Sequence, residues 1–401
     1  MSHRKELIKN FLSFGAVDIL GLIIPIVTMP ILTRALGPSQ YGVYMLLLTI
    51  VFFGHTIIDY GTQYTAVRAL ASNRDDPVAV NSIYQETQGL RLFLCLLYSI
   101  GAISYSLFLS FDNAVFYMIL ASSTYLLGYA LTPIWFYQGI GAVERAMKVS
   151  LLIKLLNLCT IILVVNSPDD LVIVFSSLCL PMLFGGIYLS HLASLHYNVG
   201  FPSLARLKQS LHQGRDVFIG LLAPNLYNAI PTIALGAIYP PAEFVNFAIA
   251  SRLASVVVTI QDVVAKAIYP IIARIKESQV KKLLIINGAV SLVPIAVLLI
   301  CGDWLVKVFL GRGFSQVNEY LLIFTVGVFF IGLSNAISKG YLLPHGYDSL
   351  YRNISLRVSL VSAIVCILGI FFWGIWGGAF AITLARMLFF VDYLICYSKL
   401  K

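Results

Sequence analysis

The sequence predicts an all-α polytopic membrane protein with about 12 transmembrane helices, arranged in two six-helix lobes. First, 59% of the 401 residues are apolar and only 11% are charged, about half the charged fraction of a soluble domain. Second, the apolar residues come in runs of about 20, the length that a helix needs to cross a bilayer. Third, these runs lack the alternation that strands of a membrane barrel show. Helices are therefore the expected spanning elements.

The expected helices are the apolar windows between charged or turn-rich stretches. The first follows Arg4, Lys5 and Lys9, and it exceeds the apolar core of a signal peptide, so we expect it to remain as a span. The windows cover residues 11–33, 41–60, 90–110, 114–137, 149–166, 170–192, 215–238, 242–264, 282–301, 319–340, 354–372 and 376–397. Three longer basic segments are expected to lie along the membrane surface, at residues 61–89, 193–214 and 265–281.

The Lys and Arg residues favour one side of this expected topology. With the N-terminus inside, only Arg34, Lys307 and Arg312 fall on the outer side, and most other cations fall in inner tails or loops. Cytoplasmic loops carry such an excess, so both termini are expected to be cytoplasmic. Topology and anionic lipid also account for the net charge of +9 without a nucleic-acid partner.

A polar connector divides the expected helices into two sets of six. We expect an N-terminal lobe over residues 1–200, a cytoplasmic connector over 201–214 and a C-terminal lobe over 215–401. Because six is even, the lobes enter the bilayer in the same orientation and are related by a pseudo-two-fold axis along the membrane normal. Four residue pairs at a shift of 203 residues support this repeat: Pro38 with Pro241, Tyr41 with Phe244, Tyr44 with Phe247 and Asp59 with Asp262.

Prolines occur in pairs in the first expected helix of each lobe. Pro25 and Pro30 lie in one, and Pro224 and Pro231 lie in the other. Proline removes a helical hydrogen bond and kinks the segment, so we expect kinked, moving helices around a central site. The alternative is that prolines are simply common in membrane helices.

The run PILTRALGPSQYGVY at residues 30–44 resembles the opening of the Wzx-type flippases, which translocate lipid-linked O-antigen and exopolysaccharide units. The likeness continues through residues 57–61 and 66–71. These flippases belong to the multidrug/oligosaccharidyl-lipid/polysaccharide exporter superfamily, which also holds multidrug exporters and the peptidoglycan lipid flippase.

The resemblance implies a flippase in the bacterial inner membrane. It would carry an undecaprenyl-diphosphate-linked oligosaccharide, an O-antigen or exopolysaccharide repeat unit, from the cytoplasmic to the periplasmic leaflet by alternating access. The implied partners are this glycan, membrane lipids, a polysaccharide polymerase and a chain-length regulator. No cofactor is implied, and energy would come from a proton or sodium gradient, the membrane potential or product removal.

Two other functions remain open. An ion-coupled drug exporter of the same superfamily would favour a carboxylate-rich cavity, whereas the central charges here are arginines. A membrane polymerase or ligase of lipid-linked glycans would need a sizeable outer loop, and the longest expected one, residues 302–318, is short. The sequence also shows no phosphate-binding loop, catalytic motif or metal-ligand spacing. We therefore expect a transporter rather than an enzyme.

Cations inside or beside the expected helices are the candidate substrate-binding residues. Arg252, Arg386 and Lys154 lie within spans, where a charge costs about 2.5–3.5 kcal/mol by insertion scales. They are expected to line a water-filled cleft, because an Arg fork binds phosphate oxygens bidentately; the alternative is pairing with a carboxylate such as Asp18. Further candidates are Arg34 at the outer end of the first span, and Arg68, Arg91, Lys266 and Lys339 at the inner mouth.

Three carboxylates are candidates for coupling to a proton or sodium ion. Asp18 lies in the first expected helix, and Asp59 and Asp262 end the second and eighth at the inner face. A carboxylate at a helix C-terminus meets an unfavourable dipole. Structural salt bridges of Asp59 and Asp262 with a basic partner such as Arg68 or Lys266 are therefore the alternative.

Overall fold

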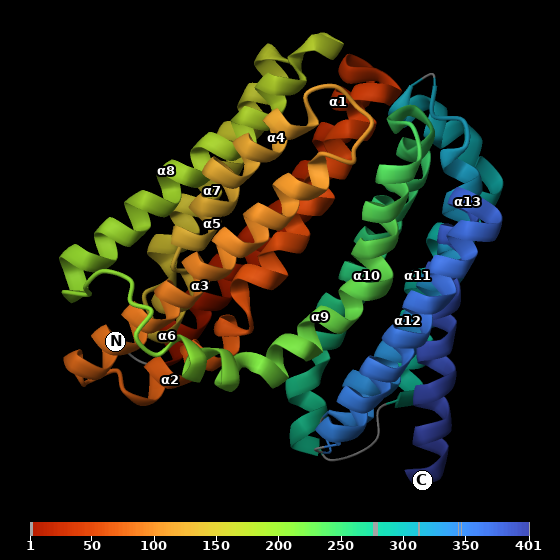
Figure 1. Cartoon of the computed structure of the whole chain (residues 1–401). Helices are drawn as coiled ribbons and strands as arrows, with labels where there is room; N and C mark the ends of the chain where they lie inside the picture. Colours follow the sequence, from red (N-terminus) through yellow and green to blue (C-terminus); the bar gives the residue numbers. More distant parts are fainter. Residues whose placement is uncertain (1–2, 276–279, 312, 344, 346, 401) are drawn as a thin grey trace. The chain divides into compact units, whose positions relative to one another are not determined.

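The computed structural model divides into two compact units, Met1–Leu222 and Ala223–Lys401. The backbone is described for residues 3–275, 280–311, 313–343, 345 and 347–400, and side chains for the same residues except 3–20, 22, 262–275 and 348. These described residues contain helices and turns but no strand (Figure 1). The boundary between the two units falls inside α9 (Leu207–Ile238), after the expected connector at residues 201–214.

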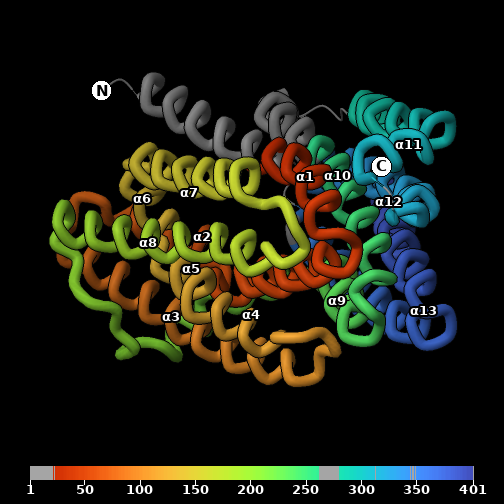
Figure 2. The backbone as a smooth tube through the Cα atoms, turned by 90° about the horizontal axis from the view of Figure 1, so that it is seen from above, coloured from red at the N-terminus to blue at the C-terminus, as the bar shows by residue number. Residues whose placement is uncertain are grey.

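Unit 1 is a bundle of helices that precede and include the start of α9. Its elements are α1 (His3–Asp59), α2 (Thr62–Ser72), α3 (Pro77–Ser106), α4 (Ala114–Leu120), the π-helix η1 (Ala121–Leu126), α5 (Leu127–Leu131), α6 (Ile134–Gly139), α7 (Val143–Val164), the 3₁₀ turn η2 (Pro168–Asp170) and α8 (Leu171–Tyr197). Within this unit α1 packs against α3 and α7, and α8 packs against α5 and α7 (Figure 2). The short helices α2 and α6 pack against each other.

Unit 2 is a bundle in which α12 occupies the central position. Its elements after α9 are α10 (Pro241–Ile275), α11 (Val280–Leu310), α12 (Val317–Ile337), the π-helix η3 (Ser338–Leu342) and α13 (Asp348–Leu400). Helix α12 packs against α10, α11 and α13. Side chains on α12 therefore contact three neighbouring helices at once.

Ten helices in the described part of the chain are long and apolar enough to cross a membrane. Two of these segments, Ile23–Ser72 and Ser349–Leu400, contain 50 and 52 residues, far more than the roughly 20 that one crossing needs. The backbone leaves helical angles inside each, at Gly37 in α1 (φ 67°) and at Gly374 in α13 (φ 57°). Counting each long segment as two crossings is compatible with the expected 12 spans.

The four expected proline interruptions do not end their helices. Pro25 and Pro30 lie inside α1, whose break is at Gly37 instead, and Pro224 and Pro231 lie inside α9. Membrane helices tolerate proline where neighbouring groups satisfy the freed backbone. Kinks at these four prolines stay a prediction, and the backbone of α1 leaves helical angles at Gly37.

The two aromatic pairs that suggested an internal repeat have similar local packing in the two units, whereas the Asp262 side chain of the aspartate pair lies outside the described residues. Tyr41 and Tyr44 are buried with ring centroids 5.9 Å apart at 37°, and Phe244 and Phe247 are buried with centroids 6.3 Å apart at 38°. Each pair lies within two turns after a proline, Pro38 directly after the break at Gly37 in α1 and Pro241 at the start of α10. The match supports an internal repeat at the level of side-chain packing.

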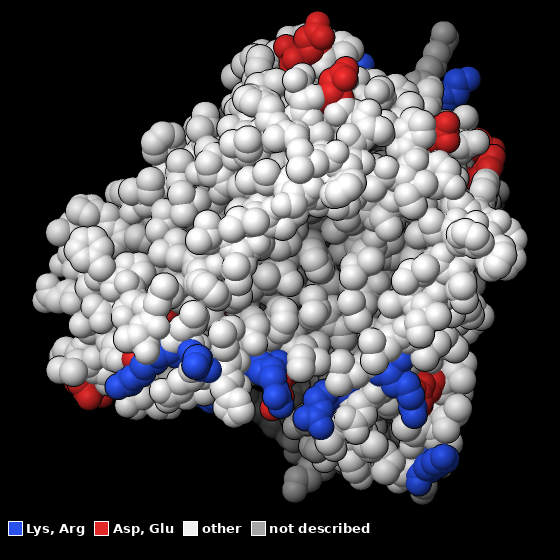
Figure 3. All heavy atoms as spheres, in the orientation of Figure 1, with Lys and Arg blue, Asp and Glu red and all other residues white. Residues whose placement is uncertain are grey.

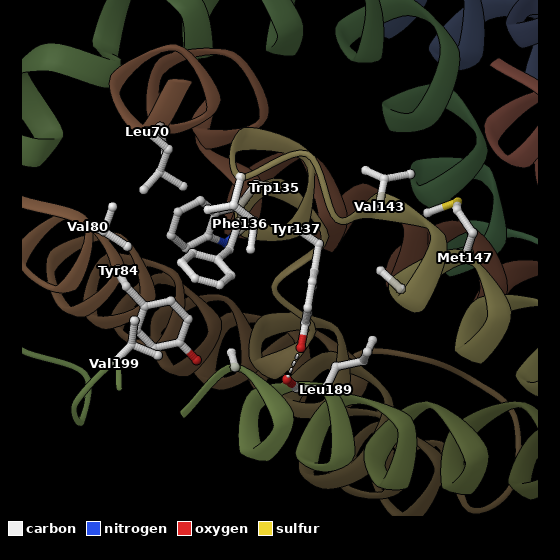
Figure 4. Packing of buried hydrophobic residues seen from close by; sticks show 14 residues of the cluster. Leu70, Val80, Tyr84, Trp135, Phe136, Tyr137, Val143, Met147, Leu189 and Val199 are labelled. Carbon is white, nitrogen blue, oxygen red and sulfur yellow. Dashed lines mark hydrogen bonds between the residues drawn. The ribbon is translucent and has the colours of Figure 1, made fainter. Parts of the chain in front are cut away.

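Aromatic residues of α6 form the centre of a buried cluster in unit 1. Trp135, Phe136 and Tyr137 are fully buried among apolar residues of α2, α3, α7 and α8 (Figure 4). The hydroxyl of Tyr137 donates a hydrogen bond of 2.8 Å to the carbonyl of Leu189 in α8. The cluster therefore holds the short helices α2 and α6 to the longer helices of the unit.

The surface of both units suits a lipid environment. Large apolar side chains are exposed along the helices, among them Leu163 in α7, Ile300 in α11 and Phe371 in α13. On the face shown in Figure 3, the Lys and Arg side chains of each unit lie mainly along one end, and uncharged residues cover the middle. The chain is therefore a multi-pass membrane protein.

Candidate substrate and ion sites

A buried ion pair in unit 1 joins two of the candidate residues. Arg91 of α3 pairs through Nη1 with the Oδ1 carboxylate oxygen of Asp59, the last residue of α1. The Arg91 side chain is 2% exposed and that of Asp59 is 21% exposed. Tyr129 of α5 donates a hydrogen bond of 3.0 Å to the other oxygen of Asp59. Both oxygens of the carboxylate are therefore bound within the unit.

Arg91 also donates hydrogen bonds to backbone carbonyls at the C-terminal end of α5. It donates to the carbonyls of Tyr129 at 2.9 Å and Ala130 at 3.3 Å, and its neighbour Gln88 donates to Ala130 at 2.8 Å. The last carbonyls of a helix lack helical donors, and α5 ends here because Pro133 forces Thr132 into an extended conformation. A cation at this terminus also complements the helix dipole. The carbonyls left without donors where α5 ends thus explain why the charge of Arg91 is buried at this point.

The structure therefore revises two expectations from the sequence. Asp59 does have a basic partner, but this partner is Arg91 and not Arg68, which is exposed on α2. Arg91 was expected at the inner mouth, and it instead lies in the interior of unit 1, with its guanidinium directed at Asp59, Thr62 and the end of α5.

His55 lies beside this ion pair and was not singled out from the sequence. Its ring stacks on Tyr129 with centroids 3.7 Å apart at 9°, and on Tyr125 with centroids 5.5 Å apart at 9°. The buried Nε2 atom of His55 has no hydrogen-bond partner among the described residues. The signal available in the sequence was a spacing of four residues, His55 to Asp59 and Tyr125 to Tyr129, which places each pair on one helix face.

Lys154 of α7 is half-buried and points at α1. Its Nζ atom lies 2.9 Å from the place that a Cβ atom on Gly21 would occupy. The Gly21 carbonyl lacks its usual helical donor, because Pro25, four residues later, has no N–H. Lys154 thus lies next to Gly21 in the first expected span. Asp18, on the preceding turn of α1, has a side chain outside the described part.

The remaining basic candidates differ in exposure. Arg34 in α1 is exposed, whereas Arg252 in α10 and Lys339 in η3 are half-buried. Lys266 and Asp262 of α10 fall in the stretch whose side chains are not described.

Arg386 lies inside unit 2, between α13 and α12. It is 4% exposed, and its Cδ atom lies 3.0 Å from the place that a Cβ on Gly327 of α12 would take. One turn earlier, Thr383 donates a hydrogen bond of 3.0 Å to the Ile323 carbonyl. The Nη1 atom of Arg386 is buried and has no hydrogen-bond partner in the described residues. Gly327 therefore makes room for a cation that only partly meets its hydrogen-bonding needs.

Sequence comparison identifies relatives along nearly the whole chain. A model of the family described as "Polysaccharide biosynthesis protein" matches residues 7–276. A protein of Escherichia coli (strain K12) named "Putative O-antigen transporter" is 25% identical over 377 residues, which cover 91% of this chain and 90% of that protein. A protein of Shigella dysenteriae with the same name is 24% identical and covers 96% of this chain and 97% of its own length.

Structure comparison identifies transporter folds. An inward-facing multidrug resistance MATE family transporter of the MOP superfamily has a TM-score of 0.75 at 16% identity and covers 94% of each chain. The lipid II flippase MurJ, in an inward closed conformation, has a TM-score of 0.75 at 13% identity and covers 96% of this chain and 87% of that one. The likeness establishes the fold and, because a drug transporter and a lipid flippase score equally, does not separate these two functions.

Proposed function

Because the chain belongs to the polysaccharide biosynthesis protein family, we propose that it is a flippase for an undecaprenyl-diphosphate-linked oligosaccharide. The substrate is an O-antigen or exopolysaccharide repeat unit, which moves from the cytoplasmic to the periplasmic leaflet. The observation that carries this proposal is the match, over at least nine-tenths of the chain, to two proteins named "Putative O-antigen transporter". The MATE and MurJ folds add that the architecture is one used for moving molecules across or within a membrane.

The mechanism we propose is alternating access between two six-helix lobes. The expected lobes at residues 1–200 and 215–401, joined by the connector 201–214, correspond roughly to the two compact units. The glycan head would cross through a polar path while the lipid tail stays in the bilayer. No bond is made or broken, so the protein acts as a transporter and not as an enzyme.

We assign the cations two different roles according to their burial. We assign binding of the diphosphate to the cations that are exposed or half-buried: Arg34, Arg68, Lys154, Arg252 and Lys339. Lys266 joins them from its sequence position alone. Arg91 and Arg386 are almost fully buried between helices, so we propose that they position helices, because a buried guanidinium offers few donors to a mobile substrate.

The coupling ion belongs to the same proposal. Asp18, Asp59 and Asp262 are the carboxylates expected to couple transport to a proton or sodium gradient. Of these, Asp59 is held in its ion pair with Arg91 and Tyr129, which supports a structural role. Asp18 and Asp262 then remain the better coupling candidates.

The cellular setting completes the proposal. We place the protein in the bacterial inner membrane with both termini cytoplasmic, since the inner loops carry most of the Lys and Arg. A polysaccharide polymerase and a chain-length regulator would use the flipped glycan. An ion-coupled drug exporter is the less favoured alternative, because both relatives are named for O-antigen transport.

The test follows the glycan across the membrane. In a strain that lacks this protein, newly made lipid-linked glycan should accumulate on the cytoplasmic side, and the wild-type chain should restore its exposure to the periplasm. Arg252→Ala should fail to restore exposure at equal protein level, and Arg252→Lys should restore it in part, because an ammonium still binds phosphate as a point charge. Normal exposure without the protein, together with a block in polymerisation or ligation, would refute the flippase function.

A further inference from the structure

Residues from four helical segments meet at one end of unit 2, around the ring of Tyr320. This ring, near the start of α12, contacts the ring of Trp376 in α13, with centroids 4.5 Å apart at 35°. The Tyr320 phenol also lies within electrostatic reach of Glu319, Glu243 and Tyr239. We refer to these five residues as the aromatic–carboxylate patch.

The patch lies at the end of unit 2 that the expected topology places outside. Glu243 is in the first turn of α10 and Glu319 in the first turn of α12, where a negative charge complements the helix dipole. Tyr239 directly follows α9, and Trp376 follows the break at Gly374 in α13. On the face shown in Figure 3, acidic side chains lie at the end of this unit opposite most of its Lys and Arg.

Close neighbours within unit 2 support the two tyrosine rings of the patch. Tyr320 packs edge-on against the buried ring of Phe247 in α10, with centroids 6.2 Å apart at 82°. A Cβ at Gly374 would collide with the Tyr239 hydroxyl, and the positive φ of Gly374 also favours glycine. Both rings therefore have a fixed contact in the interior or at the break of α13.

The patch presents polar groups that the described residues leave unpartnered. Tyr320 is 2% exposed, yet its hydroxyl has no hydrogen-bond partner among the described residues. A buried phenol usually has such a partner. Glu243 and Glu319 are exposed and form no ion pair in the described part of the chain. Trp376 is 36% exposed, so part of its ring is open to a ligand.

The charge of Glu319 is not needed to build the start of α12. At the shift of 203 residues that relates the repeated pairs, the start of α12 corresponds to the start of α4. Tyr320 then corresponds to Tyr117, which is also buried, and Glu319 corresponds to Phe116, which is exposed. The helix start thus accepts an apolar residue where unit 2 has a carboxylate. This difference points to a role for the carboxylate outside packing.

We propose that the aromatic–carboxylate patch binds an uncharged or amino sugar of the transported glycan. The C–H face of a sugar ring is apolar and packs on an aromatic ring such as that of Trp376. Sugar hydroxyls donate charge-assisted hydrogen bonds to carboxylates, and the Tyr320 hydroxyl adds one more polar partner. The two carboxylates repel a diphosphate or an acidic sugar. That the glycan is the cargo rests on the proposed flippase function, whereas sugar binding is tested without it.

The binding test uses the purified full-length protein in phospholipid nanodiscs, because detergents with sugar head groups would compete. The probe is the repeat-unit oligosaccharide, released by mild acid from the lipid carrier of cells that make this protein and titrated by calorimetry. We expect saturable binding of one oligosaccharide per chain, which inorganic pyrophosphate does not inhibit. Trp376→Ala, Glu243→Gln and Glu319→Gln should each weaken binding about tenfold. Trp376→Phe should bind more tightly than Trp376→Ala, because it keeps an aromatic ring.

Trp373→Ala is the matched control for Trp376→Ala. Trp373 is 69% exposed on the other side of the break in α13, and its ring contacts Phe372, so the variant should bind the oligosaccharide as the wild type does. The two glutamine variants change exposed residues and should unfold at the wild-type temperature. Absent binding to the wild type, competition by pyrophosphate, or equal binding by the wild type and Trp376→Ala would overturn the proposal. Equal losses in Trp373→Ala and Trp376→Ala would indicate an interfacial aromatic belt and would also overturn it.

Flipping in proteoliposomes separates this site from the proposed function. Glu243→Gln and Trp376→Phe should flip the glycan severalfold more slowly than the wild type at equal protein level. Unchanged flipping by variants that bind the oligosaccharide weakly would overturn a role of the patch in transport. Oligosaccharide binding by a wild-type protein that flips no glycan would refute the flippase function and leave the sugar site standing.

Discussion

Arg91 and Asp59 form an ion pair inside unit 1 that joins the middle of α3 to the end of α1. The same guanidinium binds the last carbonyls of α5. One side chain therefore connects three helices, at the point where the chain leaves its second expected span. Arg91, which the sequence predicts as a substrate-binding residue, instead holds helices of unit 1 together.

Arg91→Ala should destabilise the protein strongly. Removing one partner of a buried pair typically costs about 3–5 kcal/mol, because the remaining charge is left buried without compensation. Here the loss would also leave the carbonyls of Tyr129 and Ala130 without this donor. Thermal unfolding of the purified protein in detergent measures the effect. Arg91→Lys should rescue little, since an ammonium does not reproduce the fork that reaches Asp59 and α5 together.

Arg68→Ala provides the matched control for that variant. Arg68 is exposed on α2, and surface changes away from special contacts usually stay within about 0.5 kcal/mol. Equal unfolding temperatures for Arg91→Ala and the wild type would contradict the assigned role of the ion pair.

The sequence predicted the helical architecture well where hydropathy determines it. The expected gap between residues 372 and 376 coincides with the break at Gly374 in α13. Helix α3, however, begins at Pro77, well before the expected start at residue 90. Its first turns are polar, so an apolar window misses them. The N-terminal cap of α3 could be predicted from the sequence, because an aspartate followed directly by proline is a common helix start. In the structure Asp76 accepts hydrogen bonds from the backbone N–H groups of Val78 and Ala79.

The internal polar contacts could not be predicted in the same way. Asp59 and Arg91 are separated by 32 residues, and their pairing depends on how α1, α3 and α5 pack. Tyr320 and Trp376 likewise belong to different helices, and nothing in their local sequence marks them as neighbours. Hydropathy reports which segments are buried in lipid, whereas these contacts depend on which faces of the helices meet.

His55→Phe should leave the fold stable. The ring of His55 stacks on Tyr129, and phenylalanine keeps a flat ring there while removing the unpartnered nitrogen, whose burial is costly. His55→Ala should instead lower stability, because it removes a stacked pair worth about 0.5–1.5 kcal/mol beyond its buried area. Unfolding curves of the two variants would show this order. A reversed order would mean that the histidine nitrogen has an essential partner.

Gly186→Ala should destabilise unit 1 by separating α8 from α5. A Cβ at Gly186 would lie 2.3 Å from the Gly128 carbonyl oxygen, a backbone atom that moves only with its helix. Small residues allow such close approach of membrane helices, and overpacking typically costs about 1–3 kcal/mol. Gly101→Ala is the control, because nothing lies within 4 Å of its added methyl group, and alanine should gain about 0.5–1 kcal/mol in a helix. Opposite shifts in unfolding temperature are expected, and two shifts of the same sign would argue against close packing of α5 on α8.

Arg386→Met should retain or raise the stability of the protein. The guanidinium is buried between α12 and α13 with one group unpartnered among the described residues, and replacing buried charges by apolar residues of similar volume is often neutral or stabilising by about 1–4 kcal/mol. Gly327→Val should be the damaging change, since its Cβ would meet both the Arg386 side chain and the Thr383 backbone.

Glycan flipping by the Arg386→Met variant then separates a framework role from substrate binding. If Arg386 positions helices, the stable variant should flip the glycan more efficiently than Arg252→Ala does, measured as periplasmic exposure at equal protein level. A variant that unfolds at or above the wild-type temperature yet flips no glycan would show that this cation acts on the substrate. In that case the helices around Gly327 would have to open during transport, because the charge is otherwise 4% exposed.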